Sequence, residues 1–169
     1  MEEDQPQCEL PEIRIDRDGV WYYRNMEMKR TDIVHYFYQH LRRDSQGNYR
    51  IDLNHEQCRI EVEDVPYVIR SVSSNASNGD GSLAGMTVLL SDGSSEELDP
   101  ETIRMGEGNV LYCRVKKREH EARFSRQAYY QLAEYIEYDS HRNRYYLMIG
   151  DRPHTLAVNR PAEKGGPHA

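Results

Sequence analysis

The stretch MEMKRTDIVHYFYQHLRRDSQGNYRI, residues 26–51, recurs in worn form as ARFSRQAYYQLAEYIEYDSHRNRYYLMI, residues 122–149. Both copies open with an apolar-x-apolar-x-Arg pattern, which ends at Arg30 in the first copy and at Arg126 in the second. A helical pattern, an Asp-Ser turn and an aromatic strand follow in each copy. This recurrence indicates a duplicated core, and it places a ligand site between two similar halves.

The helix of the first copy is predicted to begin near Arg30 or Thr31, with Thr31 as its N-cap, and to end by Asp44. In the second copy Ser125 is the expected N-cap. Apolar residues fall at helical spacing in both copies. They are Ile33, Val34, Phe37 and Leu41 in the first helix, and Tyr129, Leu132, Ala133 and Ile136 in the second.

Strand patterns surround both helices. Residues 13–16 alternate apolar and polar side chains, and Asp18-Gly19 predicts a hairpin turn into residues 20–23. Further strands are predicted at residues 49–53, 58–62, 67–72, 86–90, 95–98, 109–115, 145–149 and 155–158. Residues 116–121 are expected to form a charged turn. We therefore expect an α+β fold with two small antiparallel sheets, each carrying one helix.

The composition along the chain predicts its division. Residues 13–75 are expected to form the N-terminal half and residues 85–158 the C-terminal half. The Ser-, Asn- and Gly-rich segment 76–84 is the predicted flexible linker. The ends, residues 1–12 and 159–169, are predicted to be disordered.

Bulk properties limit the function. The 169 residues carry a net charge of −7, which argues against a broad nucleic-acid footprint. No apolar run approaches the roughly 20 residues needed to span a bilayer, so no membrane association is expected. Cys8, Cys58 and Cys113 are odd in number and far apart, which favours a reducing compartment. A cytoplasmic location follows as the expectation.

Arg30 and Arg126 are the central candidates for a site, because both are expected in the first turn of a helix, where a cation is mildly unfavourable. One interpretation is a structural ion pair with a carboxylate of a neighbouring strand, such as Asp64. The other is an anion-binding pair, since guanidinium groups and exposed helix N–H groups both suit phosphate or carboxylate. In that interpretation Asp64 orients an arginine, and Tyr67 or Trp21 shapes the wall.

No pattern in the sequence predicts catalysis. The seven histidines form no metal-binding set, and Gly79-Asp80-Gly81 leads into no helix suited to a phosphate loop. We therefore expect no catalytic residue, no metal and no cofactor. An enzyme is the third interpretation, behind two kinds of binding module.

Several stretches together resemble a bacterial family catalogued as domain of unknown function 1285. They include an Asp-Gly-x-Trp piece, a Glu-Asp-x-Pro-aromatic piece and a Leu-Tyr-x-Arg-Val strand that contains Arg114, a further candidate for the site. The matching stretches lie at residues 15–23, 28–30, 37–44, 62–67, 111–115 and 122–132. The chain departs from the family pattern at Leu53–Gln57, where relatives carry a Thr-Pro-Val-Glu-Lys-like segment.

The resemblance implies a duplicated α+β core whose second half is pleckstrin-homology-like. It also implies a small, nucleotide-like ligand in the cleft between the halves and a role in signalling. With the arginine pair, it predicts a non-enzymatic module that binds a small anionic ligand. The alternative is a protein–protein interaction module in which the Arg and Asp residues are purely structural. The oligomeric state is not indicated by the sequence.

Overall fold

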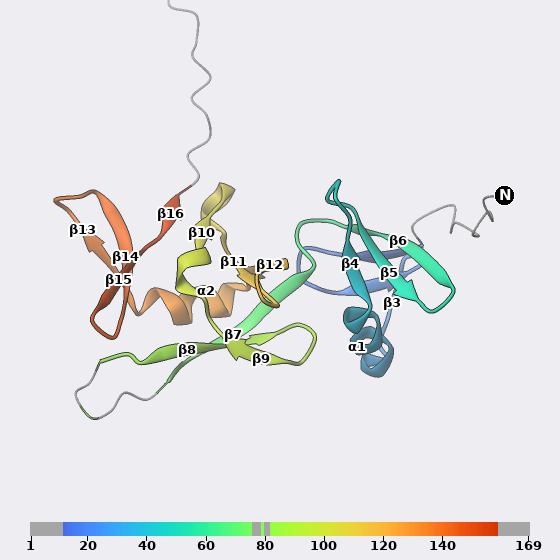
Figure 1. Cartoon of the computed structure of the whole chain (residues 1–169), viewed down its shortest axis with the longest axis horizontal. Helices are drawn as coiled ribbons and strands as arrows, with labels where there is room; N and C mark the ends of the chain where they lie inside the picture. The colour runs from blue at the N-terminus through green and yellow to red at the C-terminus, as the bar shows by residue number, and fades with distance from the viewer. Residues whose placement is uncertain (1–11, 76–78, 80–81, 159–169) are drawn as a thin grey trace, which may run out of the picture. The chain divides into compact units, whose positions relative to one another are not determined.

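The computed structural model describes residues 12–75, 79 and 82–158, and these residues divide into two compact units (Figure 1). The predicted disordered ends lie outside the described residues, apart from Glu12. Most of the predicted linker, residues 76–78 and 80–81, lies outside them as well.

The division differs from the predicted one. The first unit runs to Val68 and also includes Ser91–Ser94, whereas the second contains Ile69–Leu90 and the chain from Ser95 onward. The physical reason is strand pairing, because β7 (Tyr67–Asn75) pairs antiparallel with β8 (Gly85–Leu90) over nearly its whole length. This strand was predicted within the first half, but it belongs to the seven-stranded sheet of the second unit.

The first unit contains one described helix and a six-stranded sheet in the order β3-β2-β1-β6-β5-β4. Its elements are β1 (Ile13–Ile15), β2 (Trp21–Tyr23), β3 (Met26–Glu27), α1 (Thr31–Gln39), β4 (Leu41–Arg43), β5 (Tyr49–Leu53) and β6 (Glu56–Val62). β1 and β6 are parallel, so the expectation of a purely antiparallel sheet is wrong. The β4-β5-β6 meander joins the β1-β2-β3 meander through this one parallel pair.

The Asp18-Gly19 turn between β1 and β2 forms as predicted. Asp16 Oδ1 accepts hydrogen bonds from the backbone N–H groups of Asp18 and Val20, both at 2.9 Å. Gly19 has φ +80°, and a Cβ there would lie 2.9 Å from Val68 Cγ2. Both the backbone conformation and the close approach therefore require glycine at this position.

α1 begins where the sequence predicts and ends before Asp44, but its N-cap and the place of Leu41 differ from the prediction. Its N-cap is Arg30, in an extended conformation and without a side-chain cap, so the prediction of Thr31 as N-cap is wrong. The helix ends at Gln39, five residues before Asp44, and Leu41 starts β4 instead of extending the helical face. Leu41 pairs with Ile51 of β5, and this strand pairing overrides the helical spacing of Phe37 and Leu41.

Aromatic side chains form the core where α1 meets the sheet. Trp21 packs edge-on against Tyr38 with ring centroids 4.9 Å apart, and Tyr38 stacks on Tyr67 at 4.8 Å. The Tyr38 hydroxyl donates to the carbonyl of Pro66 at 3.0 Å and also bonds Ser91 Oγ at 2.9 Å. Ser91 Oγ in turn accepts from the Val68 N–H group at 3.0 Å. The segment Ser91–Ser94 is thus tied into the core of the first unit.

The second unit contains one described α-helix, a seven-stranded sheet in the order β16-β10-β11-β12-β7-β8-β9, and a three-stranded sheet in the order β13-β14-β15. Besides β7 and β8 its elements are β9 (Ser95–Glu97), η1 (Pro100–Thr102), β10 (Arg104–Met105), η2 (Glu107–Asn109), β11 (Leu111–Val115), β12 (His120–Phe124), α2 (Arg126–Ala133), β13 (Ile136–Asp139), β14 (Arg144–Ile149), β15 (Arg152–Thr155) and β16 (Ala157–Val158). The α+β class is confirmed. β10 and β16 form a parallel pair, so this sheet is also mixed.

α2 begins as predicted, since Ser125 Oγ accepts a hydrogen bond from the Ala128 N–H group at 3.1 Å and caps the helix. It ends at Ala133, and Ile136 belongs to β13, contrary to its expected place on the helical face. The predicted charged turn at residues 116–121 is shorter than expected, because His120 and Glu121 already pair in β12. The pleckstrin-homology-like character of this half stays a prediction.

Candidate functional site

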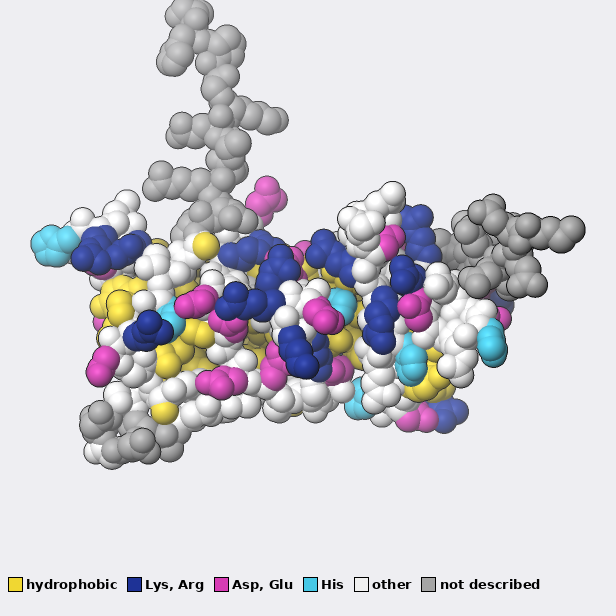
Figure 2. All heavy atoms as spheres, in the orientation of Figure 1, with side chains coloured by type: hydrophobic (Ala, Val, Ile, Leu, Met, Phe, Trp, Pro, Cys, Tyr) yellow, Lys and Arg dark blue, Asp and Glu magenta, His cyan; other side chains and the backbone are white. Residues whose placement is uncertain are grey.

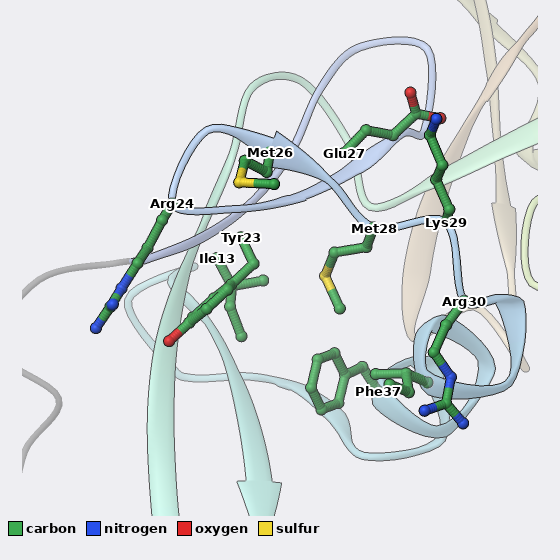
Figure 3. A pocket seen from close by; sticks show the side chains of 10 residues that line it. Ile13, Tyr23, Arg24, Met26, Glu27, Met28, Lys29, Arg30 and Phe37 are labelled. Carbon is green, nitrogen blue, oxygen red and sulfur yellow. The ribbon is translucent and has the colours of Figure 1, made fainter.

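An open groove of about 630 Å³ lies in the first unit, between the β2-β3 edge of the sheet and α1. Its walls are apolar and its rim is charged. It is lined by Ile13, Tyr23, Arg24, Met26, Glu27, Met28, Lys29, Arg30, Ile33 and Phe37 (Figure 3). Its volume is within the range of roughly 300–1,000 Å³ that small-molecule sites occupy.

The sheet side of the groove depends on the tight hairpin between β2 and β3. Tyr23 pairs with Met26, so only Arg24 and Asn25 form the loop, and both have positive φ angles of 49° and 63°. This is the backbone of a type I′ turn, which suits the twist of the two strands. The Met28 N–H group donates to the carbonyl of Trp21 at 2.8 Å, which continues the pairing beyond β3.

The helix side is formed by the N-terminal part of α1. Ile33 and Phe37 are one helical turn apart and both line the groove, because side chains four residues apart share a helix face. The Phe37 ring lies 5.9 Å from the ring of buried Trp21. The apolar stripe of α1 is therefore divided, with Tyr38 in the core and Ile33 and Phe37 only half-buried at the groove.

Two of the three cations on the rim have carboxylate partners. Arg24 pairs with Glu12 at 3.1 Å, and hydrogen bonding to Glu12 raises the pKa of the guanidinium. Arg30 pairs with Asp32 at 2.7 Å, and the hydrogen bond from Arg30 lowers the pKa of that carboxyl. The Arg30 and Asp32 side chains are 73% and 65% exposed, so their ion pair contributes little to folding.

Lys29 is the third cation on the rim. It is exposed and makes no ion pair with any residue in the described ranges, and it projects from the segment that joins β3 to α1 (Figure 3). Glu27 is the carboxylate among the lining residues. Figure 3 shows the Lys29 and Glu27 side chains pointing together away from Met28 and Phe37, so their charged ends lie outside the apolar part of the groove.

Among the residues predicted for the site, Arg30 is the one that lines this groove. Its carboxylate partner is Asp32, and a structural role for half-buried Asp64 as the partner of an arginine stays a prediction. Trp21 and Tyr67, predicted to shape a wall, are each 2% exposed and lie in the core. Their contact with a ligand stays a prediction.

The other two predicted residues belong to the second unit. Arg126 is exposed at the first position of α2, and exposed Arg114 on β11 donates from Nη1 to the carbonyl of Arg118 at 3.2 Å. A shared site for Arg30 and Arg126 stays a prediction. Lys29, Met26 and Met28 were not predicted as site residues, although the Met-x-Met pattern beside Arg30 was visible in the sequence.

Other chemistry is limited in the part of the chain that the structure describes. No group of three or more His, Cys, Asp or Glu residues is placed there to hold a metal ion. Burial raises the pKa of the Cys113 thiol, which disfavours the reactive thiolate. Neither described α-helix is long and apolar enough to cross a membrane. On the face shown in Figure 2, basic and acidic side chains are intermixed.

The fold and the groove define an α+β protein of two compact units, with a concave apolar surface in the first. Residues 3–65 match the N-terminal domain of the family described as domain of unknown function (DUF1285), so the resemblance seen in the sequence is confirmed.

Two solved structures share the fold. A DUF1285 family protein from Silicibacter pomeroyi DSS-3 is 21% identical, with a TM-score of 0.73, over 91% of this chain and 84% of that one. A DUF1285 family protein from Shewanella baltica OS155 is 19% identical, with a TM-score of 0.61, over 74% of this chain and 92% of that one. No curated protein matches the chain.

Proposed function

We propose that this protein is a non-enzymatic binding module whose first unit holds a small anionic ligand. The observation that carries the proposal is the apolar groove of about 630 Å³ with Arg24, Lys29 and Arg30 on its rim. An apolar wall with a few charged groups at the mouth is typical of sites that bury a ligand's body and orient its charge.

The exposure of the Arg30–Asp32 pair supports binding over a purely structural role for Arg30. A pair that locks a fold is shielded from water, because screening by solvent removes most of the energy of an exposed pair. Here both partners are mostly exposed. Nucleotide-like ligands belong to the proposed class, since Tyr23 and Phe37 present aromatic rings to the groove.

The proposal includes a role in signalling, in which ligand binding in the first unit is read out by a partner. A pleckstrin-homology-like second unit is part of the same proposal. Its support is the strand order, in which one meander, β7-β8-β9, is followed by a second, β10-β11-β12, and then by α2.

Thermal-shift measurements with a panel of nucleotides, aromatic carboxylates and fatty carboxylates test the proposal. A ligand that binds the folded state raises the melting temperature with its concentration. The shift should shrink in Lys29→Gln and Arg30→Gln, and persist in Lys117→Gln, which removes an exposed cation from the second unit. The proposal fails if the panel produces no shift, or if the three variants respond alike.

The β13-β14 hairpin favours a second function, binding to another protein. Tyr138 and Tyr145 form a cross-strand pair with ring centroids 4.9 Å apart, and they are 51% and 45% exposed. Tyrosine is enriched at protein interfaces. Chemical cross-linking in native lysate would test this function, since a partner captured by the wild type should be lost in a Tyr138→Ser/Tyr145→Ser variant.

A further inference from the structure

We propose that the open edge of β3 is a self-association site, at which a second copy of this chain pairs antiparallel with residues 26–29. The inference goes beyond the proposed function, because it concerns a contact between proteins and does not depend on a ligand in the groove. Three observations carry it: the backbone groups at the edge, the alternation of side chains along residues 26–29, and the self-complementary charges of Glu27 and Lys29.

β3 is an edge strand that presents backbone groups to the outside. It lies at the end of the six-stranded sheet, with β2 as its neighbour. Tyr23 and Met26 close the hairpin, and the Met28 N–H group donates to the Trp21 carbonyl at 2.8 Å. Pairs that exchange hydrogen bonds alternate with pairs that do not, so Glu27, between Met26 and Met28, directs its N–H and C=O groups to the open edge. Such an edge is a template for pairing with another strand.

Side chains alternate along the same residues. Met26 and Met28 line the apolar groove. The Glu27 and Lys29 side chains point together away from Met28, on the other face of the strand (Figure 3). Met26 is 75% exposed, so apolar surface faces water beside the open edge. A strand added to this edge covers that surface with its own groove-side residues, and burial of apolar surface favours association.

The charges of residues 26–29 are complementary to those of a second copy. In an antiparallel pair centred on Met28, Glu27 lies opposite the partner's Lys29, and Lys29 lies opposite the partner's Glu27. Opposite charges that face each other across two strands stabilise the pair, and like charges destabilise it. Neither Glu27 nor Lys29 makes an ion pair with another described residue of its own copy. Both charges are therefore available to the partner.

The hydrogen bonding agrees with the same centre. Met28 turns its N–H group inward to β2, and the alternation turns the backbone of Glu27 outward, where it meets the partner's Lys29. The partner's Met28 lies opposite Met28 on the groove side, so each copy covers the mouth of the other's groove. The same residues serve both copies, which makes the contact a closed two-fold dimer.

The test is sedimentation-velocity ultracentrifugation of the full chain over a range of concentrations at low salt. The wild type should show a concentration-dependent equilibrium between monomer and dimer. Glu27→Lys and Lys29→Glu each place like charges opposite one another, so each variant alone should dimerise about tenfold more weakly or worse. Glu56→Lys makes the same change of charge at an exposed position of β6 and should leave the dimer unchanged.

Two combinations should restore association. An equimolar mixture of the Glu27→Lys and Lys29→Glu chains makes every facing pair opposite in charge, so the two should form a mixed dimer about as strong as that of the wild type. The double variant Glu27→Lys/Lys29→Glu should dimerise with itself for the same reason. Hydrogen exchange locates the contact, because the Glu27 amide should exchange more slowly in the wild-type dimer than in the Lys29→Glu monomer.

Three outcomes would overturn the inference. A wild type that stays monomeric at every concentration excludes the dimer, and if its Glu27 amide is nevertheless protected, another segment covers the edge. A dimer that persists in both single variants uses a different surface. Single variants that remain monomeric when mixed would show that the facing charges of Glu27 and Lys29 do not hold the copies together.

Discussion

The segments around α1 and α2 share one order of elements but differ in what their helices contact. Each has a strand, a helix and a hairpin in succession, namely β3-α1-β4-β5 and β12-α2-β13-β14. α2 buries Ala128 and Leu132 completely, whereas α1 buries Tyr38 and leaves Ile33 and Phe37 at an open groove. The same local pattern thus produces a packed helix in one unit and one wall of a candidate site in the other.

The largest expected effect is a difference in unfolding free energy when one apolar side chain of each helix is truncated to alanine. Leu132→Ala removes a fully buried side chain and should cost about 2–5 kcal/mol of unfolding free energy. Ile33→Ala should cost well under half as much, because the groove already exposes part of that side chain to water. Urea denaturation, followed by far-UV circular dichroism for the first variant and by the single tryptophan for the second, measures both.

Equal losses in the two variants would contradict the comparison, because they would show that the α1 face is as well packed as the α2 face. Ile33→Val is the control for Ile33→Ala, since it removes one methyl group and should have a smaller effect.

The polar anchor of α1 provides the next largest effect. Ser91→Ala deletes the hydroxyl that accepts from the buried Val68 N–H group and bonds the Tyr38 hydroxyl. Leaving a buried N–H group without its acceptor should cost about 1–3 kcal/mol. Trp21 fluorescence during urea denaturation monitors the loss in the first unit. Ser95→Ala, at an exposed position, is the control, and a comparable loss there would refute this role of Ser91.

The two helices differ in their N-cap residues. The Ser125 side chain caps α2, whereas the Arg30 side chain makes no capping hydrogen bond to α1, and this difference should affect stability measurably. Ser125→Ala removes the cap of α2 and should destabilise it by about 1 kcal/mol. α1 begins after Arg30 without a side-chain cap, so Arg30→Ser should instead raise its unfolding midpoint. Urea denaturation tests both predictions. The midpoint followed by circular dichroism should fall in Ser125→Ala, and the midpoint followed by Trp21 fluorescence should rise in Arg30→Ser. A stabilising effect of Ser125→Ala would contradict the capping geometry.

The local elements were largely predictable, because their signals lie within a few residues. The Asp18-Gly19 turn and the Ser125 cap formed as expected, since each depends on side chains adjacent to the backbone groups that they satisfy. The ends of the helices were harder to predict from the sequence. Leu41 and Ile136 fit a helical face in sequence but lie in β4 and β13, because pairing with the next strand along the chain decides their conformation.

The groove could be predicted only in part, for a related reason. Arg30 was recognised from its place in the repeat, and it lines the groove. The sequence does not show which part of an apolar helix stripe meets the sheet and which stays open. Lys29 and Met28 were therefore missed, since their relevance comes from the packing of α1 against the β2-β3 hairpin.

The smallest expected effect concerns the charge of Asp32 beside the groove. The hydrogen bond from Arg30 lowers the carboxyl pKa, so the folded state holds this proton less tightly than the unfolded state, whose Asp pKa is about 3.9. The stabilisation is therefore present above about pH 4 and is lost as the pH falls through the lower folded-state pKa. NMR titration of the Asp32 carboxyl should show its pKa returning toward the ordinary value in Arg30→Gln. An unchanged pKa in that variant would mean that Arg30 is not held by Asp32 in solution, and Arg30 would then be available to an anion.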